Sequence, residues 1–160
     1  MKKEIIAARI FNAPIELVWK NWTEPELVMR WWGPDRFTSP YAKINFREGG
    51  SSIVCMRAPI EFGGQDTYNV WTYKTIVPNE KIEYVQNLSD EHGNIVDPIK
   101  VNMPADFPKD TETIVTFKKL GEDKTEMVVK ELADFGQIFE FAKIGLEQCL
   151  DKMVAIFNRS

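Results

Sequence analysis

The amino-acid sequence predicts an α+β fold, in which a curved antiparallel β-sheet wraps around one long C-terminal helix and two short helices follow the first strand. The stretch from about Phe37 to Leu132 predicts the sheet, because short runs rich in Val, Ile, Thr, Tyr and Phe alternate with turn residues. The segment from Gln137 to Arg159 predicts the long helix, because its apolar residues recur at steps of three and four. Helix-start signals before the β-rich stretch predict the two short helices.

The opening residues indicate the first strand and the helix that follows it. Glu4–Phe11 is rich in Ile, Phe and Ala, which is typical of a strand. An alanine and a proline follow Asn12, and Asn is favoured at helix N-caps, so we expect Asn12 to cap the first helix. The apolar residues between Ile15 and Trp22 give this helix one apolar face.

A capping box indicates the second short helix. Thr23 lies three residues before Glu26, with Pro25 in the first turn. This helix should run to about Trp31. Gly33-Pro34 then ends it, since the residue before a proline avoids helical geometry.

Six further strands are expected, joined as consecutive antiparallel hairpins, which is the economical connection. One connection, Ser89–Asp110, is long for a loop and carries Pro98, Pro104 and Pro108. A loop of this length is either a lid or binding element or an ordered surface excursion. The expected strands are Tyr41–Phe46, Ser52–Ala58, Tyr68–Val77, Lys81–Leu88, Thr113–Leu120 and Thr125–Leu132.

The last helix carries an apolar stripe about 35 Å long, at a rise of 1.5 Å per residue. Such a stripe needs a partner, and the sheet is the only surface large enough in the predicted fold. Gly145 lies within this helix, where glycine costs about 0.5–1 kcal/mol relative to alanine. Its presence indicates either space for a cavity or close packing on a strand.

The composition bounds the class of protein. The 160 residues fit a single domain over 1–160, and 44% hydrophobic with 28% charged residues is ordinary for a globular protein. A net charge of −4 with scattered basic residues argues against a nucleic-acid partner. No apolar run is long enough for a signal segment or membrane insertion. Two distant cysteines, Cys55 and Cys149, argue against a disulfide framework and favour a cytoplasmic location.

The residue patterns predict no catalytic residues, no metal site and no cofactor. His92, the only histidine, lies among turn-forming residues, so a solvated loop histidine is favoured over a general base. Metal-ligand spacing, a glycine-rich phosphate loop and a nucleophile elbow are all missing from the sequence. Cys149, on the apolar stripe, and Cys55, in a strand, are expected to act as small hydrophobic residues.

Several short motifs resemble the SRPBCC (START/Bet v 1-like) superfamily, and most closely its branch named for the C-terminal domain of the activator of heat-shock-protein ATPase. The resemblance covers nearly the whole chain. Its opening motifs are RIFNAP at 9–14, ELVW at 16–19, WT at 22–23, PEL at 25–27 and WWGP at 31–34. Later landmarks are Gly49-Gly50 before a strand ending in Met56-Arg57, VPNEKI at 77–82, and Gly145-Leu146 with Leu150.

The resemblance implies a helix-grip fold, whose long helix and sheet enclose a cavity that holds an apolar or aromatic small molecule in many relatives. Members of the superfamily include lipid carriers, polyketide cyclases, antibiotic-sequestering proteins and chaperone regulators. Because one fold serves so many roles, it does not decide the function.

Candidate ligand-binding residues follow from three patterns. Every second residue of a strand faces the same side of the sheet (strand parity), and the apolar stripe of the last helix faces the sheet. The resemblance also implies which residues face inward in the strand after Gly49-Gly50. Tyr73 or Tyr84 could supply a lone polar group to orient an apolar ligand. The candidates are Val54, Met56, Tyr73, Tyr84, Val115, Phe117, Met127 and Val129 on the sheet, Phe141, Gly145 and Cys149 on the helix, and Trp32 and Phe37 at the mouth.

Three functions remain open on the sequence. The first is non-catalytic binding of a small apolar or aromatic molecule in the cavity. The second is a chaperone-regulating domain that acts through its outer surface, with a chaperone as its partner. The third is an enzyme of cyclase or aromatase type, in which the shape of the cavity folds the substrate.

Overall fold

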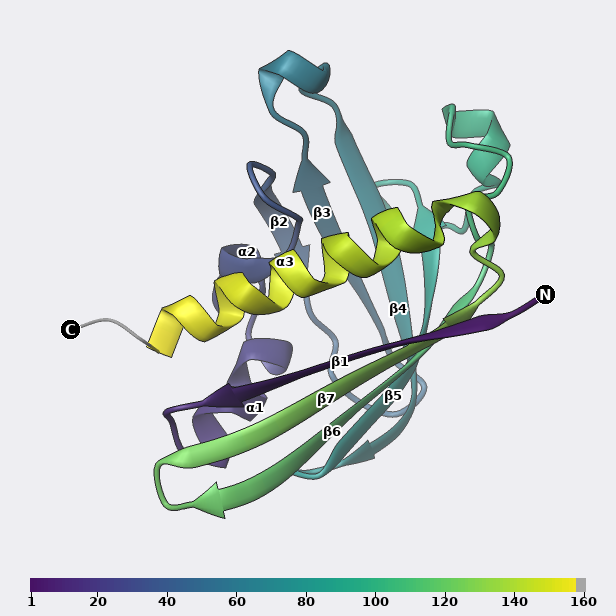
Figure 1. Cartoon of the computed structure of the whole chain (residues 1–160). Helices are drawn as coiled ribbons and strands as arrows, with labels where there is room; N and C mark the ends of the chain where they lie inside the picture. Colours follow the sequence, from purple (N-terminus) through teal and green to yellow (C-terminus); the bar gives the residue numbers. More distant parts are fainter. Residues whose placement is uncertain (158–160) are drawn as a thin grey trace.

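A computed structural model describes residues 1–157, and its seven strands form one strongly curved antiparallel sheet (Figure 1). The strands lie in the order β1-β7-β6-β5-β4-β3-β2, so β2 to β7 are consecutive hairpins and β1 returns to pair with β7. The strands are β1 (Lys3–Phe11), β2 (Thr38–Lys43), β3 (Ser51–Arg57), β4 (Asp66–Val77), β5 (Lys81–Ser89), β6 (Thr111–Gly121) and β7 (Lys124–Ala133).

The three α-helices lie on the concave side of the sheet. The long helix α3 (Phe139–Phe157) crosses the concave face, and α1 (Ile15–Thr23) and α2 (Pro25–Trp31) lie near its C-terminal end (Figure 1). Three short 3-10 helices complete the chain: η1 (Ile60–Phe62), η2 (Pro98–Val101) and η3 (Gly136–Ile138). The predicted α+β architecture, a curved sheet around a long helix with two short helices after the first strand, is confirmed. No helix in the described part of the chain has the length and apolar character needed to cross a membrane.

Buried and more exposed residues alternate along the strands, so one set faces the concave side of the sheet and the other faces solvent. In β6, Thr111, Thr113, Val115 and Phe117 are buried while the residues between them are partly or fully exposed. The corresponding inward positions of β7 run from Thr125 to Ala133 in steps of two. This alternation assigns the inward faces of β6 and β7.

Aromatic side chains fill the part of the concave face next to α1 and α2. The ring centroids of Trp22 and Trp31 lie 4.7 Å apart, and those of Trp71 and Tyr84 lie 5.0 Å apart. Trp31 stacks on Trp71 at 6.3 Å, and its Nε1 donates to the Asn21 carbonyl at 2.8 Å. The two short helices thus close one end of the fold with large, buried rings.

The predicted caps of the short helices are wrong. Pro14, not Asn12, holds the N-cap of α1, and its carbonyl accepts from the backbone of the first turn, which leaves Asn12 too far from the helix start. Glu24, not Thr23, holds the N-cap of α2, because Thr23 is still part of α1 and one residue separates the helices. Neither N-cap side chain makes a capping hydrogen bond.

Element boundaries shift by a few residues elsewhere. The predicted strand Tyr41–Phe46 is observed as β2, Thr38–Lys43, with an irregular register between Thr38 and Tyr41. The predicted helix from Gln137 begins at Phe139, because η3 occupies the residues before it. Its predicted end, Arg159, lies outside the described residues.

Candidate functional site

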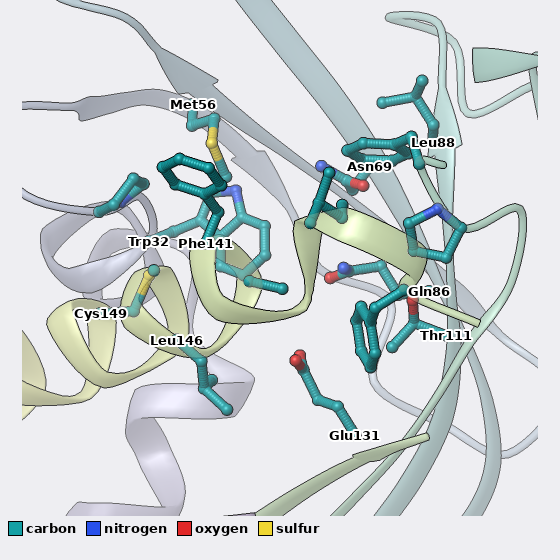
Figure 2. A pocket seen from close by; sticks show the side chains of 17 residues that line it. Trp32, Met56, Asn69, Gln86, Leu88, Thr111, Glu131, Phe141, Leu146 and Cys149 are labelled. Atoms are coloured by element: carbon teal, nitrogen blue, oxygen red, sulfur yellow. The ribbon is translucent and has the colours of Figure 1, made fainter. Parts of the chain in front are cut away.

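A cavity of about 300 Å³ lies between the concave face of the sheet and α3, beside the aromatic cluster (Figure 2). Its lining is mostly apolar, and it lies under the N-terminal half of the helix. The residues that line it are Trp32, Pro34, Met56, Asn69, Gln86, Leu88, Phe107, Pro108, Thr111, Glu131, Phe135, Ile138, Phe141, Ala142, Gly145, Leu146 and Cys149.

Helix α3 forms one side of the cavity through residues that share a helical face. Phe141, Gly145 and Cys149 follow one another at four-residue steps, with Ala142 and Leu146 beside them. A Cβ atom added at Gly145 would meet no atom within 4 Å. Gly145 therefore borders open space and does not pack closely on a strand.

Phe141 and the loop between β5 and β6 lie at the entrance. Phe141 is 78% exposed although it lines the cavity. The loop contributes Phe107 and Pro108. It is attached to the start of the helical region because the backbone N–H of Gln137 donates to Asp106 Oδ2 at 3.1 Å. The long loop is thus part of the site, and whether it moves as a lid stays a prediction to be tested.

Polar side chains lie on the sheet side of the cavity, at inward positions just beyond the aromatic cluster. Asn69, Gln86, Thr111 and Glu131 each come from a different strand, β4 to β7 in turn. Figure 2 shows the Gln86 amide and the Glu131 carboxylate extending from the sheet into the space beneath α3. Each of these strands therefore changes from apolar to polar on the same face.

The Gln86 amide is oriented by the aromatic cluster. Trp71 Nε1 donates to Gln86 Oε1 at 2.8 Å, which occupies the acceptor end of the amide. Within residues 1–157, no partner accepts from Gln86 Nε2. Because an amide nitrogen carries two N–H donors, Gln86 has hydrogen-bonding capacity left for a molecule in the cavity.

Glu131 is the chemically most unusual residue of the site. Among the described residues, no hydrogen bond or ion pair holds its carboxylate, and burial alone raises the pKa of this carboxyl from its usual 4.5 to about 7. In turn, the Glu131 charge adds to the effect of burial on two neighbours: it helps to raise the pKa of the Tyr84 hydroxyl and that of the Cys149 thiol. Both neighbours therefore stay protonated at neutral pH.

Two further buried polar groups at the cavity lack partners within the described chain. Trp32 is 9% exposed, and its Nε1–H, a donor, makes no hydrogen bond. Asn69 is 6% exposed, and none of its side-chain atoms bonds to residues 1–157. Because buried polar groups are nearly always hydrogen-bonded in folded proteins, the Asn69 amide marks a place where a bound molecule could complete the hydrogen bonding, whereas Trp32 Nε1 is enclosed by the protein.

The structure brings five of the thirteen predicted ligand-binding residues together around this cavity. Trp32, Met56, Phe141, Gly145 and Cys149 line it. Burial raises the pKa of the Cys149 thiol to about 12, so this cysteine is a weakly polar lining group and not a thiolate.

The other eight predicted residues lie outside the cavity lining, and the reason is the rings of α1 and α2. Trp22 and Trp31 fill the half of the concave face that strand parity had assigned to a ligand. The Tyr73 hydroxyl bonds to Ser52 Oγ at 2.7 Å, so it is already satisfied. Seven of the eight, Val54, Tyr73, Tyr84, Val115, Phe117, Met127 and Val129, pack in the core, and Phe37 lies in the loop between α2 and β2.

Sequence reasoning missed Glu131 and the other polar residues of the lining. A signal for them existed, because Glu131 follows Met127 and Val129 at the inward spacing of β7, where a charged residue is out of place. Gln86 follows Ile82 and Tyr84 in the same way. Phe107 and Pro108 carried no such signal, since they lie in an irregular loop.

Comparison with known proteins agrees with this architecture. Solved structures with the same fold include a protein of Chromobacterium violaceum (TM-score 0.76, 20% identity, covering 98% of this chain and 99% of that one). Others are a protein of Arthrobacter aurescens (0.74, 24%, 98% and 85%) and one of Silicibacter pomeroyi named AHSA1 (0.69, 12%, 96% and 96%). No curated protein matches the chain significantly.

A family model described as "Activator of Hsp90 ATPase homolog 1-like protein" matches residues 12–158. The match begins just before α1 and includes α3, so it spans every element that lines the cavity. The predicted resemblance to this branch of the SRPBCC superfamily is confirmed, and the chain belongs to the family of Activator of Hsp90 ATPase homolog 1-like proteins.

Proposed function

We propose that this protein binds a small, mainly apolar or aromatic molecule in the cavity between the sheet and α3, without cofactor chemistry. The observation that carries the proposal is the cavity of about 300 Å³, lined largely by apolar side chains and a few polar groups that have no partner within residues 1–157. Ligand sites in proteins have this character, with an apolar lining and a small number of polar groups that orient the ligand.

Gly145 adds support because it keeps the cavity open. In the middle of a helix, glycine lowers the stability of the folded protein by about 0.5–1 kcal/mol relative to alanine. No neighbouring atom lies within 4 Å of the position that a Cβ atom would take, so close packing does not require glycine here. A residue with no large side chain at this position leaves room for a ligand beside the helix.

Native mass spectrometry of gently purified protein, followed by denaturing extraction, tests the proposal. We expect a reproducible small-molecule adduct in the parent protein and in Gly145→Ala, since one methyl group fits the open space. Gly145→Leu should fill the cavity and lose the adduct while staying folded, as judged by circular dichroism and thermal unfolding. A folded Gly145→Leu variant that keeps the adduct would contradict the assignment of the cavity.

Contact with a chaperone is the second candidate, and the description of the family favours it. This function would use the outer surface and not the cavity. Stimulation of a purified Hsp90-type ATPase by this protein, unchanged by Gly145→Leu but lost on reversal of surface charges, would support it. The two free, buried cysteines, Cys55 and Cys149, support a reducing, cytoplasmic location for either function.

A further inference from the structure

The cavity lining carries an acidic side chain and no basic one. Of its seventeen lining residues, only Glu131 and Cys149 are ionisable, and neither Lys, Arg nor His is among them. The cavity therefore offers a single acidic group and no basic side chain of its own to balance it.

The Glu131 carboxylate is partly buried at the cavity, where a charge is costly unless it is paired. Moving an ionised group out of water without a partner is strongly unfavourable, so the group either takes up a proton or acquires a cation. Within residues 1–157 no side chain supplies that cation. A ligand that carries a positive charge would supply it from outside.

The aromatic lining favours the same kind of ligand. Trp32, Phe107 and Phe135 line the cavity with buried or partly buried rings, and the exposed Phe141 lies at its entrance. The faces of aromatic rings attract ammonium groups, and this attraction is stronger where water is excluded. A ring-lined cavity with one carboxylate thus resembles the sites that recognise organic cations.

From these observations we propose that the ligand is a small organic amine, with an apolar body held by the rings and a protonated nitrogen that pairs with Glu131. The inference rests on the proposed function and deepens it by naming the ligand class. A charge-assisted hydrogen bond is roughly twice as strong as a neutral one, so the amine should be preferred over an alcohol of the same shape. The amide nitrogen of Gln86 remains free to donate to an acceptor atom elsewhere on the ligand.

Three probes with one body test the charge preference: phenylbutylamine, phenylbutanol and phenylbutyrate. At about pH 8, titration calorimetry should show the amine binding at least tenfold more tightly than the alcohol, and the carboxylate binding most weakly. Glu131→Gln should bring the amine and the alcohol to within about twofold of each other. Glu126→Gln, the same change on the outward face of β7, should leave the preference intact.

The protons released on binding provide a second, independent readout. The titratable groups that face Glu131 are Tyr84 from β5 and Cys149 from α3, and both stay protonated near neutral pH. At about pH 6, binding of the amine should therefore release about one proton, measured in buffers of different ionisation enthalpy. The affinity should rise as the pH increases from about 5.5 to 7 and then level off. Glu131→Gln should release none.

The possible outcomes separate this inference from the proposed function. Equal binding of amine and alcohol, blocked by Gly145→Leu, would overturn the amine and leave the cavity as a ligand site. A preference for the amine that survives in folded Glu131→Gln would overturn the role of Glu131. Failure of all three probes to bind, together with native mass spectra free of any adduct, would overturn both the inference and the proposed function.

Discussion

Glu131 makes the stability of the empty protein depend on pH, and the sign follows from its environment. Burial raises the pKa of this carboxyl from 4.5 to about 7 in the folded protein. Below about pH 4.5 the group is protonated in both the folded and the unfolded chain, and its full contribution to stability is present. As the pH rises through about 7 that contribution is lost, because the folded protein then holds an unpaired charge.

Glu131→Leu should remove the fall in the free energy of unfolding that the Glu131 carboxyl causes as the pH rises. Between about pH 5 and 8, we expect the free energy of unfolding of the parent to fall relative to the variant by on the order of 2 kcal/mol, since a tenfold change in proton affinity corresponds to about 1.4 kcal/mol. Urea unfolding at several pH values measures the difference. If the two proteins show parallel pH profiles, groups other than Glu131 control the stability in this range.

Gly145 offers a second test at the scale of one residue. Gly145→Ala should raise the free energy of unfolding by about 0.5–1 kcal/mol, because alanine is the better helix former and its methyl group meets no atom within 4 Å. Denaturant unfolding measures the gain. A loss of stability would show that the space beside Gly145 is occupied in solution.

At the scale of elements, α3 holds the loop that brings Trp32 and Pro34 to the cavity. The Lys152 Nζ donates to the carbonyls of Pro34 and Phe37, at 2.9 Å each. The Gln148 side chain accepts from the backbone N–H of Asp35 at 3.1 Å. The C-terminal half of the helix thus fixes a segment that lines the site under its N-terminal half.

Lys152→Met should loosen this attachment. The methionine keeps an apolar stem of similar length but leaves two carbonyls without their donor, so we expect a loss of about 1–3 kcal/mol in unfolding free energy. Binding of phenylbutylamine should also weaken, because Trp32 and Pro34 are no longer held. Lys152→Arg, which keeps the charge and the donors, is the control. Unchanged binding in folded Lys152→Met would show that the loop is held by its other contacts.

The elements themselves could be predicted from the sequence because their signals are local. Runs of strand-forming residues bounded by turn residues identified all seven strands, and the three- and four-residue spacing of apolar residues identified α3. The caps at Asn12 and Thr23 failed because a cap depends on where the helix starts, and the prolines at 14 and 25 decided that. Sequence patterns define an element better than its ends.

At the scale of the whole molecule, the concave face is divided into a packed half and an open half. The packed half contains the rings contributed by α1 and α2, and the open half carries Asn69, Gln86, Thr111 and Glu131. This division is why strand parity predicted only part of the site. Parity tells which residues face inward, but the placement of Trp22 and Trp31 decides which of them a ligand could reach, and that placement is a long-range property of the fold.

The two halves should respond differently to truncation. Trp31→Ala should lower the free energy of unfolding by about 3–5 kcal/mol, because Trp31 is 1% exposed, packs among other rings and donates to the Asn21 carbonyl. Asn69→Ala, at an open position without a hydrogen bond to the described residues, should change the unfolding free energy by less than about 1 kcal/mol. Thermal and urea unfolding of both variants measure the contrast, and comparable losses would show that the cavity half is equally well packed.

The arrangement of the rings has an optical consequence. The protein has five tryptophans, and Trp32, at the cavity, lies 5.9 Å from Trp31 and 5.3 Å from Trp71 by ring centroid, while Trp71 lies 6.1 Å from Trp22. Indoles this close exchange excitation energy readily. A molecule that quenches Trp32 would therefore dim the emission of the neighbouring tryptophans as well. Occupancy of the cavity should be readable from the intrinsic fluorescence of the unlabelled protein.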